Sequence, residues 1–176
     1  MDVFQAIQER TSYRGAYKPA PVPKEDLQTI MDAGLAAPSG CNKQTTRLIA
    51  VDDPALLKTL TGLTGFKVGR SAPALICVLT KRIVAYGDTT FFTQDYSAAI
   101  QNMLLAIVSL GYESCWVEGQ VKNENRLGQK MAEILNVPAD WELTCYLPVG
   151  TADEPLTHVK KAPYSERAWF NGYQNH

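Results

Sequence analysis

The stretch Ala74-Leu75-Ile76-Cys77-Val78-Leu79 (ALICVL) is an uninterrupted apolar run with the length of one β-strand. Runs of this kind are typical of strands whose two faces are both covered, because neither side of the pleat then meets water. The sequence therefore predicts a buried strand here, in a sheet with a layer packed on each face.

Further elements are predicted on both sides of this strand. Shorter apolar runs predict strands at residues 47–51 (RLIAV), 114–117 (SCWV) and 143–149 (LTCYLPV). Helical spacing or helix signals predict a short helix capped by Asp2, a helix from Lys24 to the Ala37-Pro38 step, and helices at residues 54–60, 94–110 and 123–135. Because helices and strands alternate, the expected class is α/β or α+β, with about four strands flanked by helices.

Composition limits the possible functions. The chain has 176 residues, of which 45% are apolar and 20% charged, so we expect a single globular domain. With 17 basic and 18 acidic residues the formal charge is −1, which argues against nucleic acid as a partner. The uncharged residues 96–112 include several polar side chains, so they predict a buried helix and no membrane span.

The four cysteines form no C-x-x-C pair, and with only two histidines they predict no zinc or other metal site. Cys77 and Cys145 lie in apolar runs and are expected to be buried thiols. With no signal-peptide core at the N-terminus, these features favour a cytoplasmic location.

Three short segments carry candidate binding residues. Arg10 and Arg14 stand on either side of Ser12, so two guanidinium groups could hold a phosphate, or could be two surface arginines. Asn42 and Gln44 lie on the turn at residues 37–44; they could bind a heterocycle, or satisfy the turn's own backbone. Glu118-Gly119 ends a predicted strand, where glycine would let a flat ligand approach the backbone.

The common catalytic signatures are absent from the sequence: it has no G-x-x-x-x-G-K-[ST] loop, no G-x-G-x-x-G turn and no G-x-S-x-G elbow. A chain this poor in histidine is not expected to depend on histidine acid–base chemistry. An enzyme with this sequence would therefore rely on a bound organic cofactor.

Taken together, these segments resemble the FMN-dependent nitroreductase family. Residues 10–14 (RTSYR) are similar to its R-R-S-x-R pattern, and residues 37–44 match A-P-S-x-x-N-x-Q without a gap. Residues 101–106 (QNMLLA) and 110–116 (LGYESCW) match Q-N-x-x-L-A followed by L-G-x-x-S-C-W. The order and spacing agree from residue 1 to about residue 163.

The resemblance implies a set of FMN contacts. Arg10, Ser12 and Arg14, with Thr11 in place of a common basic residue, would hold the phosphate and ribityl chain, together with the basic pair before Pro163. Asn42 would contact the flavin ring, and the turn at Pro38 and Ser39 would lie against the flavin from the other subunit. The step at residues 118–119 would approach flavin N5. Lys67 or Arg70 could reach the O2 side. The implied cofactor-binding residues are Arg10, Thr11, Ser12, Arg14, Pro38, Ser39, Asn42, Gln44, Glu118, Gly119, Lys160 and Lys161.

The resemblance also implies an α+β fold with a central mixed sheet of about four to five strands, in an interlocked homodimer. Residues 1–176 would form one FMN-binding domain, with the tail at residues 155–176 packing on the partner subunit and residues 82–93 as a candidate lid. The implied activity passes hydride from NAD(P)H through flavin N5 to nitroaromatic, quinone or similar small acceptors in two half-reactions, with no catalytic side chain.

Three other functions compete with this hypothesis. A flavin-binding sensor or carrier would have the same site without turnover. A hydrolase could use Cys41 on its turn, although no histidine is placed to activate it. A structural domain would bind no small ligand.

Overall fold

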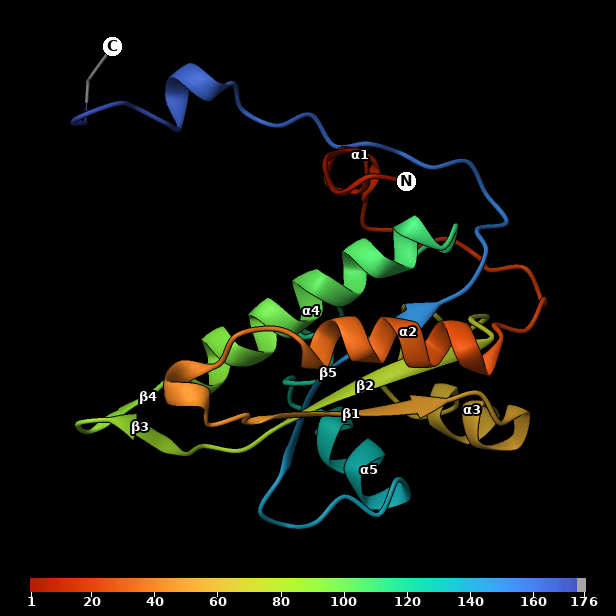
Figure 1. Ribbon diagram of the computed structural model, residues 1–176. Coiled ribbons are helices and arrows are strands. Elements are labelled where there is room, and N and C mark those ends of the chain that lie inside the picture. The colour runs from red at the N-terminus through yellow and green to blue at the C-terminus, as the bar shows by residue number, and fades with distance from the viewer. Residues whose placement is uncertain (174–176) are drawn as a thin grey trace.

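The computed structural model describes residues 1–173 (Figure 1). Its helices are α1 (Val3–Glu9), α2 (Lys24–Leu35), α3 (Pro54–Thr61), α4 (Phe92–Ser109) and α5 (Leu127–Ile134). Its strands are β1 (Thr46–Val51), β2 (Ala74–Thr80), β3 (Val84–Tyr86), β4 (Thr89–Thr90) and β5 (Glu142–Val149), and short 3-10 turns lie at Gly40–Asn42 and Tyr164–Glu166.

Strand β2 lies at the centre of a three-stranded sheet with the order β1-β2-β5. Its alternate side chains belong to two separate apolar clusters. Ala74, Ile76 and Val78 pack with residues of α2 and α4, whereas Leu75, Cys77 and Leu79 pack with residues of α3 and α5. Figure 1 shows α2 and α4 on one side of the sheet and α3 and α5 on the other. The prediction that β2 is covered on both faces is therefore confirmed.

The prediction of a mixed sheet with four to five strands is wrong, since the sheet formed by the described residues has three strands and both pairings are antiparallel. Val51 at the end of β1 pairs with Leu75 near the start of β2. The chain therefore leaves β1 and enters β2 at the same end of the strands, and the two strands run antiparallel. The strands β3 and β4 form a separate hairpin at residues 84–90.

Residues 114–117, predicted as a strand, form only one isolated bridge to β5, between Val117 and Tyr146, and a second bridge joins the preceding Glu113 to Gly150, just after β5. The reason is a competing partner, because the carbonyl of Ser114 accepts a hydrogen bond from the backbone N–H of Tyr13 (2.9 Å). This segment thus joins β5 to the loop that follows α1.

One helix boundary also differs from the prediction. Helix α5 begins at Leu127, four residues later than predicted, because the Asn123 side chain accepts the N–H of Asn125 and Arg126 has a φ of 53°. The remaining predicted helices are confirmed, including the Asp2 cap, whose carboxylate accepts the N–H of Gln5 at 2.9 Å.

A buried carboxylate ties the start of α4 to the turn that follows α2. Asp95 is only 4% exposed, and its two carboxylate oxygens accept hydrogen bonds from the N–H of Gly40 (2.8 Å) and the hydroxyl of Thr45 (2.6 Å). It thereby clamps both ends of the segment 40–45. Sequence reasoning missed Asp95, which stands directly before the uncharged stretch of the helix.

We predict that Asp95→Ala lowers the free energy of unfolding by about 2 kcal/mol or more, because two donors lose a charged acceptor in a buried place. Urea denaturation followed by circular dichroism measures this loss. Gln101→Ala, an exposed substitution on the same helix, serves as the control and should change the free energy by less than about 0.5 kcal/mol. Equal effects of the two variants would contradict the clamp.

Candidate functional site

The loop after α1 is held in place by distant parts of the chain. Thr11 is buried, and its hydroxyl donates to the carbonyl of Thr157 at 2.8 Å. Tyr13 is also buried and its N–H donates to Ser114. The loop is therefore fixed between Ser114 and the C-terminal tail. Ser12, which lies between the two anchored residues, is exposed.

A cavity of about 290 Å³ lies beside this loop. Arg10, Thr11 and Ser12 line it from the loop, and Lys161 lines it from the tail. The guanidinium of Arg10, the hydroxyl of Ser12 and the ammonium group of Lys161 are donors that suit a phosphate, while the Thr11 hydroxyl already donates to Thr157. The structure thus brings together four of the predicted phosphate-binding residues from opposite ends of the chain.

The same cavity has a further lining residue, His158, which sequence reasoning missed. The signal available was its position two residues before the predicted basic pair. Lys160 is exposed, and it is not among the residues that line this cavity. The Arg14 guanidinium donates to the carbonyl of Ser12 at 3.3 Å.

The two arginines of the loop act electrostatically on the neighbouring segment. Burial raises the pKa of the Glu113 carboxyl, and the positive charge of Arg10 partly offsets that rise. Burial raises the pKa of the Cys115 thiol to about 11, and Arg14 partly offsets it. The positive loop therefore lies along the segment that leads to Glu118.

The turn at residues 37–44 is wound tightly. Cys41, Asn42 and Gln44 all have left-handed φ values, of 48°, 53° and 49°. Three such non-glycine residues in one turn are costly, and the clamp by Asp95 provides compensation. The hydroxyl of Ser39 accepts the N–H of Gln44 at 3.0 Å, and the Gln44 amide donates to Asn42 at 3.4 Å.

A second cavity of about 380 Å³ is lined by Pro38, Ser39 and Gln44, with Arg47 and Asp95 among its other residues. The exposed Asn42 lies on the same turn. In Figure 1, α1 lies over the C-terminal part of α4, whereas the turn lies beside its N-terminal end. Within one chain, predicted phosphate contacts therefore line one cavity and three residues of the turn line another, while Asn42, Glu118 and Gly119 line neither.

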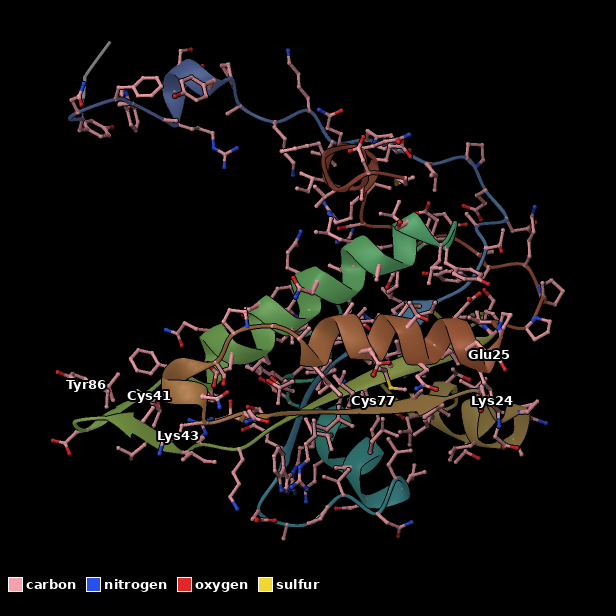
Figure 2. The ribbon with its side chains drawn as sticks, in the orientation of Figure 1. Lys24, Glu25, Cys41, Lys43, Cys77 and Tyr86 are labelled. Atoms are coloured by element: carbon pink, nitrogen blue, oxygen red, sulfur yellow. The ribbon has the colours of Figure 1, made fainter. Side chains whose placement is uncertain are left out.

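The hairpin of β3 and β4 contacts the turn at Gly40–Asn42. Figure 2 shows the labelled residues Cys41, Lys43 and Tyr86 at this same end of the molecule. Tyr86 is 75% exposed, so the hairpin presents an aromatic ring to its surroundings. Whether residues 82–93 act as a lid stays a prediction.

The Glu118-Gly119 step is held from both sides. A Glu118 carboxylate oxygen accepts a hydrogen bond from the Tyr96 hydroxyl at 2.9 Å and pairs with the Lys122 ammonium group. On the other side of the step, the Gln120 side chain accepts the N–H of Lys67 at 3.0 Å. Lys67 is thereby placed near this step, whereas the Arg70 guanidinium is tied to the carbonyl of Phe66 (2.9 Å).

Gly119 faces open space. A Cβ added there would meet nothing within 4 Å, and its φ lies outside the left-handed range. Glycine loses more conformational entropy on folding than other residues, and neither close packing nor a left-handed φ requires it at position 119. Residue 119 thus offers an accessible backbone on a rigid support.

Two kinds of feature were not found in the described part of the chain. Residues 1–173 contain no cluster of three or more His, Cys, Asp or Glu side chains able to hold a metal ion. The helices within the same range all fall short of the length and apolar character needed to cross a membrane.

Comparison with known proteins identifies relatives of this chain. The profile of the nitroreductase family matches residues 7–66 and 62–151. A protein of Archaeoglobus fulgidus, provisionally named NADH dehydrogenase/NAD(P)H nitroreductase, is 31% identical over 140 residues, which is 78% of each chain.

Solved structures agree with this assignment. One, from Parabacteroides distasonis and given the same provisional name, has a TM-score of 0.80 at 27% identity, covering 97% of this chain and 98% of that one. A nitroreductase with bound FMN from Bacteroides fragilis shares the fold, with a TM-score of 0.77 at 24% identity over 97% of this chain and 100% of the other. The resemblance first read from the residues is thus confirmed over most of the chain, which belongs to the nitroreductase family.

Proposed function

We propose that this protein is an FMN-dependent oxidoreductase that takes electrons from NAD(P)H and passes them to nitroaromatic, quinone or similar small acceptors. The observation that carries the proposal is the cavity at which Arg10, Thr11 and Ser12 meet Lys161. The protein of Bacteroides fragilis with the same fold binds FMN. Homologues with NAD(P)H in their names support the choice of electron donor.

The donor set of this cavity fits the phosphate of FMN. Arg10 and Lys161 supply positive charge, and Ser12 supplies a hydroxyl group. The Thr11 hydroxyl already donates to Thr157, so its role is to join the loop to the tail. We assign phosphate binding to Arg10, Ser12 and Lys161, with Arg14 and Lys160 adding positive charge nearby.

The flat ring fits the accessible backbone at Gly119. From Ser114, which bonds to the positive loop, the chain reaches Gly119 over at most roughly 17 Å. An elongated ligand with a phosphate at one end and a ring at the other can follow this path. The empty space outside Gly119 would admit a ring that a side chain would exclude.

Two copies of the chain would complete the site. The turn with Pro38, Ser39, Asn42 and Gln44 lies at the other cavity of the same chain, so we propose that it covers the flavin of a partner subunit. Exposed apolar side chains on α1 and on the tail support pairing; they are Val3, Phe4, Ile7, Val159, Tyr164, Phe170 and Tyr173. Obligate interfaces are apolar in this way.

FMN, when bound, supplies the atom that accepts and donates hydride, so no side chain needs to form a covalent bond. The protein's contribution is to bind the phosphate, to orient the ring and to supply charge beside it. If NAD(P)H and the electron acceptor bind in turn at the same open face of the flavin, the reaction would show two-step ping-pong kinetics.

We predict that the purified protein shows the visible absorption of oxidised FMN and oxidises NADH or NADPH in the presence of menadione or nitrofurazone. Steady-state rates are measured with NADH or NADPH varied at several fixed acceptor concentrations. The double-reciprocal plots should give the parallel lines of a ping-pong reaction. Bound FMN with no turnover above free FMN would favour a flavin sensor or carrier instead. A colourless protein that takes up no added FMN would favour a structural domain.

We predict that Arg10→Ala weakens FMN binding by about tenfold or more, because a hydrogen bond to a charged group contributes about 1.5–3 kcal/mol. Binding of riboflavin, which lacks the phosphate, should stay unchanged in this variant. Flavin fluorescence quenching measures both affinities.

Gly119→Ala is the matched variant for the ring end of the site. It should weaken FMN and riboflavin equally, with an unchanged melting temperature, since the new methyl group has space in the free protein. An Arg10→Ala protein that loses both ligands equally would contradict the assignment of the phosphate pocket.

We predict that the FMN-loaded protein sediments at about twice its 19.4 kDa chain mass. Phe4→Glu should shift it towards the monomer, because Phe4 is 75% exposed on α1 and a charge would oppose burial of this face. Lys58→Glu, exposed on α3, is the control and should leave the mass unchanged. A wild-type monomer with bound flavin would contradict the shared site.

A further inference from the structure

We propose that Lys122 is a positioning residue that neutralises Glu118 beside the flavin ring and, with Tyr96, sets both the position of the Glu118-Gly119 backbone and the reduction potential of bound FMN. This inference rests on the proposed function. It adds a role for three side chains that the phosphate pocket and the turn do not involve.

The three side chains form one closed cluster. Tyr96 lies on α4, is 2% exposed and donates its hydroxyl to Glu118 at 2.9 Å. The Lys122 ammonium group pairs with the same Glu118 oxygen and lies 3.3 Å from the Tyr96 hydroxyl. It also lies 5.6 Å from the centroid of the Tyr96 ring, within range of a cation–π contact.

This cluster is attached to the rigid part of the molecule. The ring of Tyr96 packs edge-on against Trp116, with the centroids 6.3 Å apart. The backbone of Val117 exchanges two hydrogen bonds of 3.1 Å with Tyr146 on β5. The residue directly before Glu118 and the hydroxyl that binds its carboxylate are therefore both fixed by the core.

Charge balance gives the cluster its second role. The Glu118 side chain is 25% exposed, so water screens its charge only in part. Burial lowers the pKa of Lys122, but its bonds to Glu118 and Tyr96 outweigh that effect and leave the pKa raised, so the ammonium form is retained. The neighbouring Cys145 has a pKa raised by burial, which keeps its thiol neutral.

The pair Glu118–Lys122 is consequently close to neutral as a whole. Reduction adds two electrons to a bound flavin, and an unpaired carboxylate beside the ring would oppose this gain of negative charge. Loss of the lysine charge should therefore lower the reduction potential, and loss of the carboxylate charge should raise it.

The experiment measures the midpoint potential of the FMN-loaded protein by anaerobic equilibration with a reference dye, at saturating FMN. We expect Lys122→Met to increase the ratio of oxidised to reduced FMN about tenfold at the wild-type midpoint, a shift of about 30 mV for a two-electron couple. Glu118→Gln should shift the potential in the opposite direction. Lys122→Arg, which keeps the charge, should leave it near the wild-type value.

Two further variants separate charge from position. The double variant Lys122→Met/Glu118→Gln restores charge balance and should return the potential towards the wild-type value. Tyr96→Phe keeps both charges. It should therefore weaken FMN binding and leave the midpoint potential near the wild-type value. Lys130→Met removes an exposed lysine charge on α5 and serves as the control, with no expected shift.

An unchanged potential in both Lys122→Met and Glu118→Gln, with FMN bound, would overturn the inference and leave the proposed function intact. Should Lys122→Met not fold, the Glu118→Gln potential decides alone. A wild-type protein that binds no FMN would instead overturn the proposed function, and this inference with it.

Discussion

The whole structure depends on the burial of β2 on both of its faces. Its alternate side chains belong to two apolar clusters, one beneath α2 and α4 and the other above α3 and α5. Because the strand contributes nothing to the surface, every candidate functional group lies on its neighbours or in loops. The clamp by Asp95 and the cluster around Glu118 both begin at α4, the long helix that packs on this strand.

The candidate site is built from irregular segments that the core holds in place. The loop after α1 is tied to Ser114 and Thr157, and the turn after α2 is tied to Asp95. These anchors leave Ser12, Asn42 and Gly119 exposed while their neighbours are fixed. Such an arrangement offers polar groups and open backbone in defined positions, at a low cost in ordering when a ligand binds.

Much of the fold could be predicted because its signals are local. Apolar runs and helical spacing located β2, β5, α2 and α4 to within two residues. Predictions failed where a distant partner decided the outcome. Residues 114–117 have the composition of a strand, but the carbonyl of Ser114 bonds to Tyr13 instead of completing a ladder. The antiparallel direction of the strands was also missed, because the end of the sheet at which the chain returns is not a local property of the sequence.

By itself, the sequence determined the family and the order of the elements, since motif residues and apolar periodicity are written along the chain. Only the tertiary structure decided which of the motif residues meet. It joined Arg10 and Ser12 to Lys161, added His158, and left the turn with Asn42 at another cavity. It also revealed Asp95, Tyr96 and Lys122, whose importance lies in hydrogen bonds to residues between 4 and 55 positions away. The bonds made by Asp95 and Tyr96 depend on how helices and loops pack in three dimensions, so no spacing along the chain records them, whereas the Lys122–Glu118 pair is local and gains its importance from the Tyr96 that packs against it.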